Sequence, residues 1–252
     1  MPFNWKRLRR IPATNTSTAE KIKQIRKIRD SDLGFTRTIV SEERLHSHPD
    51  FKVIEGVEYF KNRRILKSGG MKVNGTVYTG ATQREAIVTD RKYGELNKLF
   101  SRAKQKISRE KTLNDGKVIK AVFDVVRESM PIRDNEAVER LLKEKQVEED
   151  GKIALDVFIQ NKTGVCRHNA LAAADVLQHF AEEGYLKGKV SVERNTKKIN
   201  IDGVDYNAGH AWCRYTSPSG EILIIDPMHG KIKKIKEIDS SDWDYRRASD
   251  FE

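Results

Sequence analysis

The chain has 252 residues, of which 34% are charged, and a formal net charge of +11 at pH 7. No apolar run approaches the roughly 18 residues that cross a bilayer, and residues 1–20 lack the apolar stretch of a secretory signal, so we expect no transmembrane segment. Two cysteines cannot form a disulfide framework, although a single Cys166–Cys213 bridge remains open. We expect a globular protein that is cytoplasmic, or exported without a cleavable signal peptide as a secreted effector would be.

The positive charge is concentrated in the first part of the chain. Residues 1–115 carry 26 Lys and Arg against 13 Asp and Glu, whereas residues 116–252 carry 22 against 24. The turn-like residues 112–116 mark this change, so we predict a basic N-terminal region (1–115) and a second domain (116–252). The basic region could bind an acidic protein, an anionic membrane or a nucleic acid, or could simply be a solvated surface, because no zinc-finger, RNA-binding or P-loop motif accompanies the charge.

The N-terminal region is predicted to be mostly helical. Ser17–Glu20 has capping-box spacing and precedes a short basic helix with isoleucines on one face. Asn74-Gly75 lies between alternating apolar residues, which predicts a hairpin near residues 72–79. Residues 82–111 again indicate a basic helix.

The second part begins with helices and continues with strands. Val118 and three following valines share one helical face, and that helix stops at Pro131. A second helix is capped by Asp134, and a third runs from about Val165 to Glu183. Hydrophobicity then alternates with a period of two, which predicts one antiparallel sheet. Its strands are residues 189–195, 197–207 (with a turn at Asp202-Gly203), 209–215, 221–227 and 230–235. Helices followed by a meander of strands indicate an α+β fold.

Cys166 is predicted at the N-terminus of the third helix. Free backbone N–H groups and the positive end of the helix dipole favour a thiolate there. At this point three interpretations stay open: an inert packed thiol, a metal ligand beside His168, or a nucleophile.

Two further polar residues end neighbouring predicted strands. His210 begins the strand that contains Trp212, and Asp226 ends the next apolar strand before Pro227. A symmetrical hairpin centred between residues 218 and 219 places His210 opposite residue 227, one step from Asp226. A carboxylate there could orient an imidazole for a nucleophile, as a Cys-His-Asp triad requires.

These motifs resemble the transglutaminase-like branch of the papain-like cysteine enzymes. The features that carry the resemblance are Gly164–Arg167 opening an Ala- and Leu-rich helix, then His210–Trp212 on a strand, then Asp226-Pro227 ending the next strand. The order Cys, His, Asp and the helix-then-sheet setting are similar to those of the family. The resemblance covers residues 117–236 and does not extend to residues 1–115.

The resemblance implies a core in which the nucleophile begins a helix packed on an antiparallel sheet. It implies Cys166 as nucleophile, His210 as base and then acid, and Asp226 as the orienting carboxylate. Gln160 is similar in position to the glutamine that papain-like enzymes use as an oxyanion donor, with an exposed helix-end residue as the alternative. The residues after the cysteine depart from the family, since many members have an aromatic or acidic residue there.

Two residues beside the motifs are candidates for binding substrate. They are His168 and Trp212. A helix turns His168 roughly 200° away from Cys166, so we expect that it is not the base and that it binds substrate or faces solvent.

We therefore predict a cysteine enzyme that acts on an amide bond of a protein or peptide and needs no cofactor. Proteolysis is favoured, and glutamine deamidation or transamidation is the alternative. A zinc site made of Cys166, His168, His210 and Cys213 competes with this hypothesis. Positions 210 and 213 point to opposite faces of a strand and positions 166 and 168 diverge on a helix, which argues against it. A catalytically inactive binding module that recognises an acidic partner is the non-enzymatic alternative.

Overall fold

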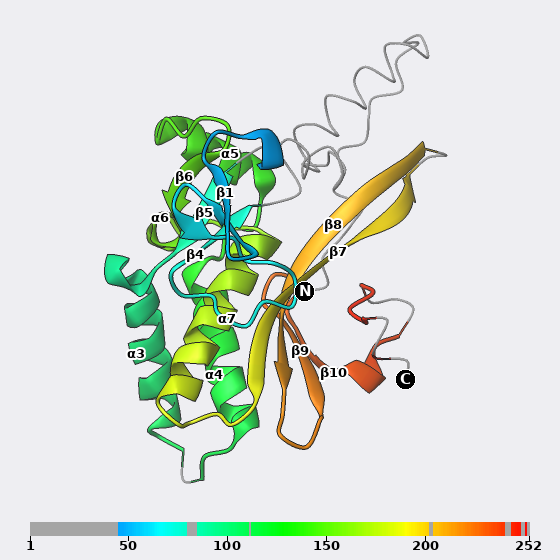
Figure 1. Cartoon of the computed structure of the whole chain (residues 1–252). Coiled ribbons are helices and arrows are strands. Elements are labelled where there is room, and N and C mark those ends of the chain that lie inside the picture. Colours follow the sequence, from blue (N-terminus) through cyan, green and yellow to red (C-terminus); the bar gives the residue numbers. More distant parts are fainter. Residues whose placement is uncertain are drawn as a thin grey trace.

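The protein is seen here as a computed structural model, which describes residues 45–79, 85–110, 112–201, 204–239, 243–247 and 250 (Figure 1). Only the backbone is described for residues 197–201 and 204–207. The basic helix predicted after Ser17–Glu20 and the predicted turn at Asp202-Gly203 lie outside the described residues.

The described chain forms an α+β fold, as predicted, but with three sheets where one antiparallel sheet was predicted. The sheet orders are β1-β2-β3, β4-β5-β6 and β10-β9-β8-β7, and all pairings between neighbouring strands are antiparallel except that of β5 with β6. In chain order, the elements are β1 (Phe51–Ile54), β2 (Val57–Phe60), β3 (Arg63–Arg64), β4 (Thr76–Thr79), β5 (Glu85–Thr89), η3 (Arg91–Tyr93), α3 (Glu95–Ile107), α4 (Asp115–Ser129), α5 (Asn135–Glu144), β6 (Gly151–Ala154), α6 (Leu155–Gln160), α7 (Cys166–Glu182), β7 (Lys189–Ile201), β8 (Val204–Thr216), β9 (Ile222–Asp226), β10 (Lys231–Lys234) and η4 (Ile235–Glu237).

Helix α7 lies at the centre of the molecule. Helices α3 and α4 pack on one side of it and the four-stranded sheet packs on the other (Figure 1). Its residues 170–174 are all fully buried, and four of these five are alanines, whose small side chains allow close approach from several directions. The helix begins at Cys166 after an extended Val165 and ends before Gly184, which has a positive φ of 82°. The helix predicted from Val165 to Glu183 is therefore confirmed to within one residue at each end.

The strands β7 and β8 form one long hairpin of 13 residues each, where shorter separate strands were predicted. Strand β9 pairs with β8 only from Cys213 to Thr216. Cys213 pairs with Ile225, so the register differs by one residue from the symmetrical hairpin predicted above. The reason is a five-residue turn, in which the Ser217 N–H donates to the Glu221 carbonyl and Gly220 has a φ of 83°.

In its described part, the region 1–115 contains five short strands besides the helical residues 45–47, η3 and α3, so this part is not mostly helical as predicted. Asn74-Gly75 does form a turn, but it precedes β4 and does not join two paired strands. Strand β4 pairs instead with β5, whose residues fall within the helix predicted at 82–111. All five residues of β5 are buried, and Ile87, Val88 and Thr89 are β-branched, which favours a strand over a helix.

The predicted boundary at residues 112–116 does not separate two cores. Leu66, Val73 and the buried face of α3 belong to the same hydrophobic cluster as α4, α7 and the inner face of the four-stranded sheet. The turn-like sequence instead caps α4, because the Asn114 side chain accepts a hydrogen bond from the Lys117 N–H. Within the described residues, no helix is both long enough and apolar enough to cross a membrane.

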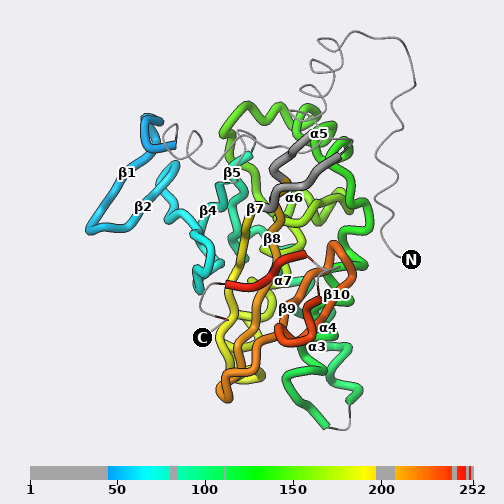
Figure 2. The backbone as a smooth tube through the Cα atoms, turned by 90° about the vertical axis from the view of Figure 1, so that its right-hand side faces the viewer, coloured from blue at the N-terminus to red at the C-terminus, as the bar shows by residue number. Residues whose placement is uncertain are grey.

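A second, smaller cluster covers the other face of the four-stranded sheet. It contains Trp212 and Ile224 from the sheet together with Trp243 and Tyr245 from the C-terminal segment. Figure 2 shows this segment, in red, crossing β7 and β8. Trp243 donates its indole N–H to Asn195 on β7 over 2.5 Å. The C-terminal segment therefore fixes the outer side of the strands that carry the candidate site.

Candidate functional site

Cys166 is the first residue of α7, and the turn before it is held by side chains of the same helix. The Val165 N–H donates to Nδ1 of His168 over 3.1 Å. The buried Asn169 amide donates to the carbonyls of Gly164 (3.2 Å) and Val165 (3.1 Å). These bonds fix the backbone at the start of α7, where the first N–H groups of a helix have no partner within it.

Gly164 is required by close packing beside the cysteine. A Cβ atom there would lie 2.8 Å from Sδ of Met130 and 2.9 Å from Cβ of His168. The Gly164 N–H also donates to the Ile132 carbonyl over 2.9 Å. The glycine before Cys166 therefore allows the loop to pass between the end of α4 and the first turn of α7.

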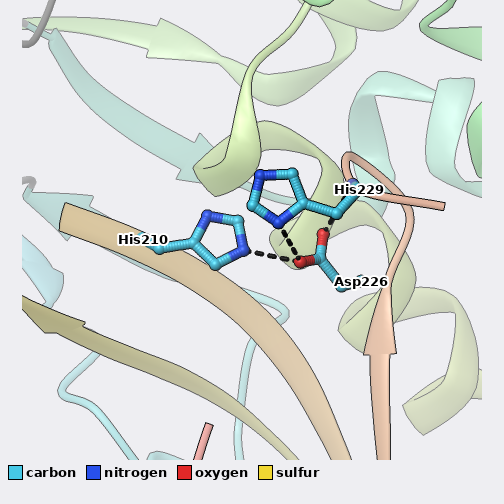
Figure 3. Close-up of side chains that lie close together, drawn as sticks. All are labelled: His210, Asp226 and His229. Atoms are coloured by element: carbon cyan, nitrogen blue, oxygen red, sulfur yellow. Dashed lines mark hydrogen bonds and ion pairs between the residues drawn. The ribbon is translucent and has the colours of Figure 1, made fainter. Parts of the chain in front are cut away.

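His210, in the middle of β8, and Asp226, the last residue of β9, form a buried pair (Figure 3). Nε2 of His210 lies 2.6 Å from Oδ2 of Asp226. Burial lowers the pKa of His210, but the charge of Asp226 and hydrogen bonds to Asp226 and Cys166 outweigh burial and raise this pKa to about 10. Burial conversely raises the pKa of Asp226, yet the charge of His210 and hydrogen bonds from two histidines bring it well below its usual range. The pair is therefore an imidazolium and a carboxylate at neutral pH.

Cys166 reaches His210 where β9 has separated from β8. The amide of Ser217 points toward β9, and alternation along β8 directs the amides of Cys213 and Ala211 to that same edge. Beyond Cys213 the edge has no β9 partner, and the Ala211 N–H instead hydrogen-bonds the Cys166 sulfur. Cys166 thus occupies the position along β8 that a longer β9 would have filled.

The environment of Cys166 favours a thiolate. Burial alone would raise the pKa of its thiol, but a hydrogen bond with His210, the charges of His210 and Arg167, and the Ala211 N–H together lower it. Because Nε2 of His210 faces Asp226, Nδ1 is the ring nitrogen left for the sulfur. Cys166 is only partly buried. The structure therefore brings together the three predicted residues Cys166, His210 and Asp226.

Two residues of the site were missing from the predicted triad. Nδ1 of His229 lies 3.0 Å from Oδ2 of Asp226, and the His229 N–H donates to Oδ1 over 3.1 Å (Figure 3). The Tyr245 hydroxyl donates to Oδ2 over 2.7 Å. His229 follows Asp226 closely in sequence, which gave a weak signal. Tyr245 lies in an irregular segment and has no periodic pattern that could have revealed it.

Aromatic rings surround the imidazole of His210. The ring of His229 stacks on it with centroids 4.3 Å apart, and Trp243 lies 5.2 Å away. Trp212 was predicted to contact substrate, but it is 2% exposed and packs against Tyr245 in the outer cluster. Its position in the strand, alternating with the inward-facing Ala211 and Cys213, turns it to the covered face, which corrects that prediction.

His168 was predicted to contact substrate or solvent, and the structure shows neither. It is fully buried, packs its ring at a tilt against Phe158 and accepts a hydrogen bond from the Val165 N–H. Burial lowers its pKa to about 4, so it is neutral, and it is 3.3 Å from the Glu85 carboxylate. It supports the turn before Cys166 and is not placed to act as the base.

Arg167 joins α7 to β5 through a buried ion pair. Its guanidinium contacts Oε1 of Glu85 over 2.6 Å. Burial raises the pKa of Glu85, but the charge of Arg167 and hydrogen bonds from His168 and Arg167 outweigh it and bring that pKa to about 2. The residue after Cys166 is thus anchored to the N-terminal part of the chain.

Gln160, the predicted oxyanion donor, is exposed at the end of α6. Its amide donates to the Glu95 carboxylate on α3 over 3.3 Å. In this structure its side chain is engaged with α3, which matches the alternative of an exposed helix-end glutamine.

The four ligands of the alternative zinc site do not converge. Cys213 is fully buried in the main core, and both cysteines are free thiols, so the open Cys166–Cys213 bridge is not seen. In the described part of the chain, the group that could hold a metal ion is His210, Asp226 and His229, whose ligand atoms lie within 4.8 Å of one another. Hydrogen bonds to Asp226 already account for this arrangement.

Comparison of the chain with protein-family models, curated proteins and solved structures gave no significant match. The site of this chain therefore consists of Cys166 at a helix N-terminus, the His210 imidazolium beside it, and the Asp226 carboxylate on the other side of the imidazolium.

Proposed function

We propose that the protein is a transglutaminase-like cysteine enzyme that cleaves an amide bond of a protein or peptide through a thioester acyl-enzyme. The observation that carries the proposal is the contact of Cys166 with His210, whose other ring nitrogen lies 2.6 Å from Asp226. A cysteine that only packs would gain nothing from these partners. Cys213 supplies the comparison within the chain, because burial raises the pKa of its thiol.

The geometry supports a two-step reaction. The Cys166 thiolate attacks the carbonyl carbon, and the Cys166 N–H donates to the resulting oxyanion. The imidazolium of His210 then gives its proton to the leaving amine, and the C–N bond breaks to leave a thioester. His210 next takes a proton from water, which attacks the thioester, releases the carboxylic acid and regenerates the Cys166 thiolate beside the imidazolium. Asp226 keeps the imidazole oriented and stabilises its charge throughout.

Two alternatives use the same residues in other ways. Attack on a glutamine side chain releases ammonia, after which water gives a deamidated product and an amine gives a transamidated one. The triad does not distinguish deamidation from transamidation, because both proceed through the same acyl-enzyme and differ only in whether water or an amine attacks it. A catalytically inactive module that recognises an acidic partner is the third candidate, and the basic balance of residues 1–115 favours it.

The charge pattern bears on the proposed partner. Several basic side chains of the described N-terminal part already pair within the chain, such as Arg63 with Asp90 and Arg91 with Asp175. Docking of an acidic protein, an anionic membrane or a nucleic acid would therefore depend on basic residues of region 1–115 other than these.

Intact-mass analysis of candidate protein substrates tests the proposed reaction. Substrates are incubated with the wild-type protein and, as a matched control, with the Cys166→Ala variant. Fragments indicate proteolysis, replacement of an amide by an acid indicates deamidation, and a gain of the supplied amine indicates transamidation. We expect fragments with the wild-type protein and unchanged substrate with the variant.

The Cys213→Ala variant serves as a second control, because it removes the other thiol of the chain. It should retain activity. Equal product formation by the wild-type and Cys166→Ala proteins would exclude the proposed mechanism.

A further inference from the structure

The proposed reaction lacks a second oxyanion donor. Acyl-transfer sites usually direct two hydrogen-bond donors at the oxyanion, and the Cys166 N–H supplies one. Gln160 is engaged by Glu95 and is exposed. A second donor would have to come from another side chain packed near the start of α7.

Arg194 lies on β7, the strand that pairs with β8. Val190 and Val192 on β7 face the main core, and alternation places Arg194 on that same face. In the β7–β8 register, Arg194 pairs with Ala211, the residue whose N–H bonds the Cys166 sulfur. Arg194 therefore lies directly across the β7–β8 pair from Ala211, the residue whose N–H contacts Cys166.

Tyr78 on β4 is held by this arginine. The Arg194 guanidinium carbon lies 5.5 Å from the centre of the Tyr78 ring, and its Nη1 donates to the next residue's carbonyl, that of Thr79, over 2.8 Å. The guanidinium also hydrogen-bonds the Tyr78 hydroxyl. Tyr78 is 5% exposed and belongs to the core cluster on which Cys166 packs.

In its contact with Arg194, the Tyr78 hydroxyl still has its own proton to donate. A guanidinium has only donors, so the Tyr78 oxygen must accept from Arg194 and its own O–H is directed elsewhere. Burial raises the pKa of Tyr78, and the nearby Cys166 raises it further, so the hydroxyl keeps its proton. A hydroxyl that accepts from a cation is also polarised into a stronger donor.

We propose that Tyr78, held by Arg194, is the second donor to the oxyanion formed at Cys166. No proton is transferred in this role, since the hydroxyl only donates a hydrogen bond to the negative oxygen. The inference rests on the proposed acyl transfer. It assigns a catalytic residue to the N-terminal part of the chain, outside the span that carries the triad.

Two reagents that differ in their transition states test the assignment. Acylation by 4-nitrophenyl acetate passes through an oxyanion, whereas alkylation by iodoacetamide displaces iodide and forms none. Both react with the same thiolate. For Tyr78→Phe we expect acylation, followed by release of 4-nitrophenolate, to slow by about 10²-fold, with the rate of Cys166 alkylation unchanged.

Arg194→Met is the second variant, because it removes the group that orients the hydroxyl and keeps the tyrosine. It should show the same selective loss of acylation. Tyr215→Phe is the matched control, since it also removes a buried tyrosine hydroxyl, one that contacts Asp115 on α4. It should leave both rates unchanged. Thermal unfolding of each variant verifies that the compared proteins are folded.

Two results would overturn the assignment. Unchanged acylation in folded Tyr78→Phe would exclude donation to the oxyanion. An equal fall in acylation and alkylation would show that Tyr78 stabilises the thiolate instead. Failure of the proposed function itself is distinguished by Cys166→Ala, which would then release 4-nitrophenolate as fast as the wild-type protein.

Discussion

At the scale of single residues, Asp226 receives more hydrogen bonds than an orienting carboxylate needs. His210, the Tyr245 hydroxyl, and both the ring and the backbone of His229 converge on it. A carboxylate with this many donors stays ionised, and its charge raises the pKa of His210. The thiolate of Cys166 thus depends on a network that extends to the C-terminal segment.

Replacing Asp226 by Asn should shift the pH dependence of thiol reactivity. The charge of Asp226 raises the pKa of His210 to about 10, and the resulting imidazolium lowers the pKa of Cys166. Without that charge the imidazole loses its proton at lower pH and the thiol pKa rises. We expect alkylation of Cys166 by iodoacetamide to slow at pH 7, with its rising limb displaced to higher pH.

Asp124→Asn is the control for this measurement, because Asp124 pairs with Lys120 on the surface of α4. Its alkylation profile should match that of the wild-type protein. Superimposable profiles for Asp226→Asn and the wild-type protein would show that Asp226 does not act on the thiol through His210.

The residues of the triad were predictable from sequence because each lies in a regular element that the residue pattern indicates. Cys166 begins a helix, and a short turn brings β9, which ends at Asp226, back beside β8, which carries His210. Tyr245 could not be predicted, since it reaches Asp226 from an irregular segment 19 residues away. Trp212 and His168 were misjudged because their burial depends on segments that cover them, Trp243 to Tyr245 and β5, respectively.

At the scale of elements, the ion pair of Glu85 with Arg167 joins β5 to the start of α7. Glu85 is 1% exposed in its side chain, so it depends on its partner for compensation of its charge. This pair fixes the residue next to the nucleophile, and it comes from a strand that sequence periodicity assigned to a helix.

Arg167→Met should destabilise the protein by about 3 kcal/mol, because it leaves the Glu85 carboxylate buried without its cation. The free energy of unfolding in urea measures this effect. The double variant Arg167→Met with Glu85→Gln removes both charges and should recover part of the loss. If the single variant unfolded at the same urea concentration as the wild-type protein, the pair would not anchor α7.

The register between β8 and β9 could not be predicted correctly from the sequence. Both strands were predicted, and so was the turn between them, but a two-residue centre was assumed. The five-residue turn at Ser217 to Glu221 shifts the register by one residue. The early separation of β9, which admits Cys166 to the edge of β8, also has no signal in the alternating pattern.

At the scale of the whole molecule, one core joins the two regions that differ in charge. Strands β4 and β5 and helix α3 pack into the same cluster as α4, α7 and the inner face of β7 and β8. The charge boundary therefore marks a change of surface and not a change of core. Charge alone reports on solubility and partners, whereas the packing of apolar faces decides the domain.

A fragment of residues 116–252 should consequently fail to fold. It lacks the apolar faces of α3, β4 and β5, which cover α7 and α4 in the full chain. Circular dichroism during heating should show no cooperative transition for the fragment and one for the full chain. A fragment that melts cooperatively near the full-length midpoint would establish residues 116–252 as an independent domain.

The central claim is that Cys166 forms an acyl-enzyme with the help of His210. Acid quenching shortly after mixing with 4-nitrophenyl acetate, followed by peptide mapping by mass spectrometry, tests it most directly. The account predicts an acetyl group on the peptide that contains Cys166, none on Cys213, and much slower acylation in His210→Ala. Acetylation confined to other residues, or equally fast in His210→Ala, would contradict it.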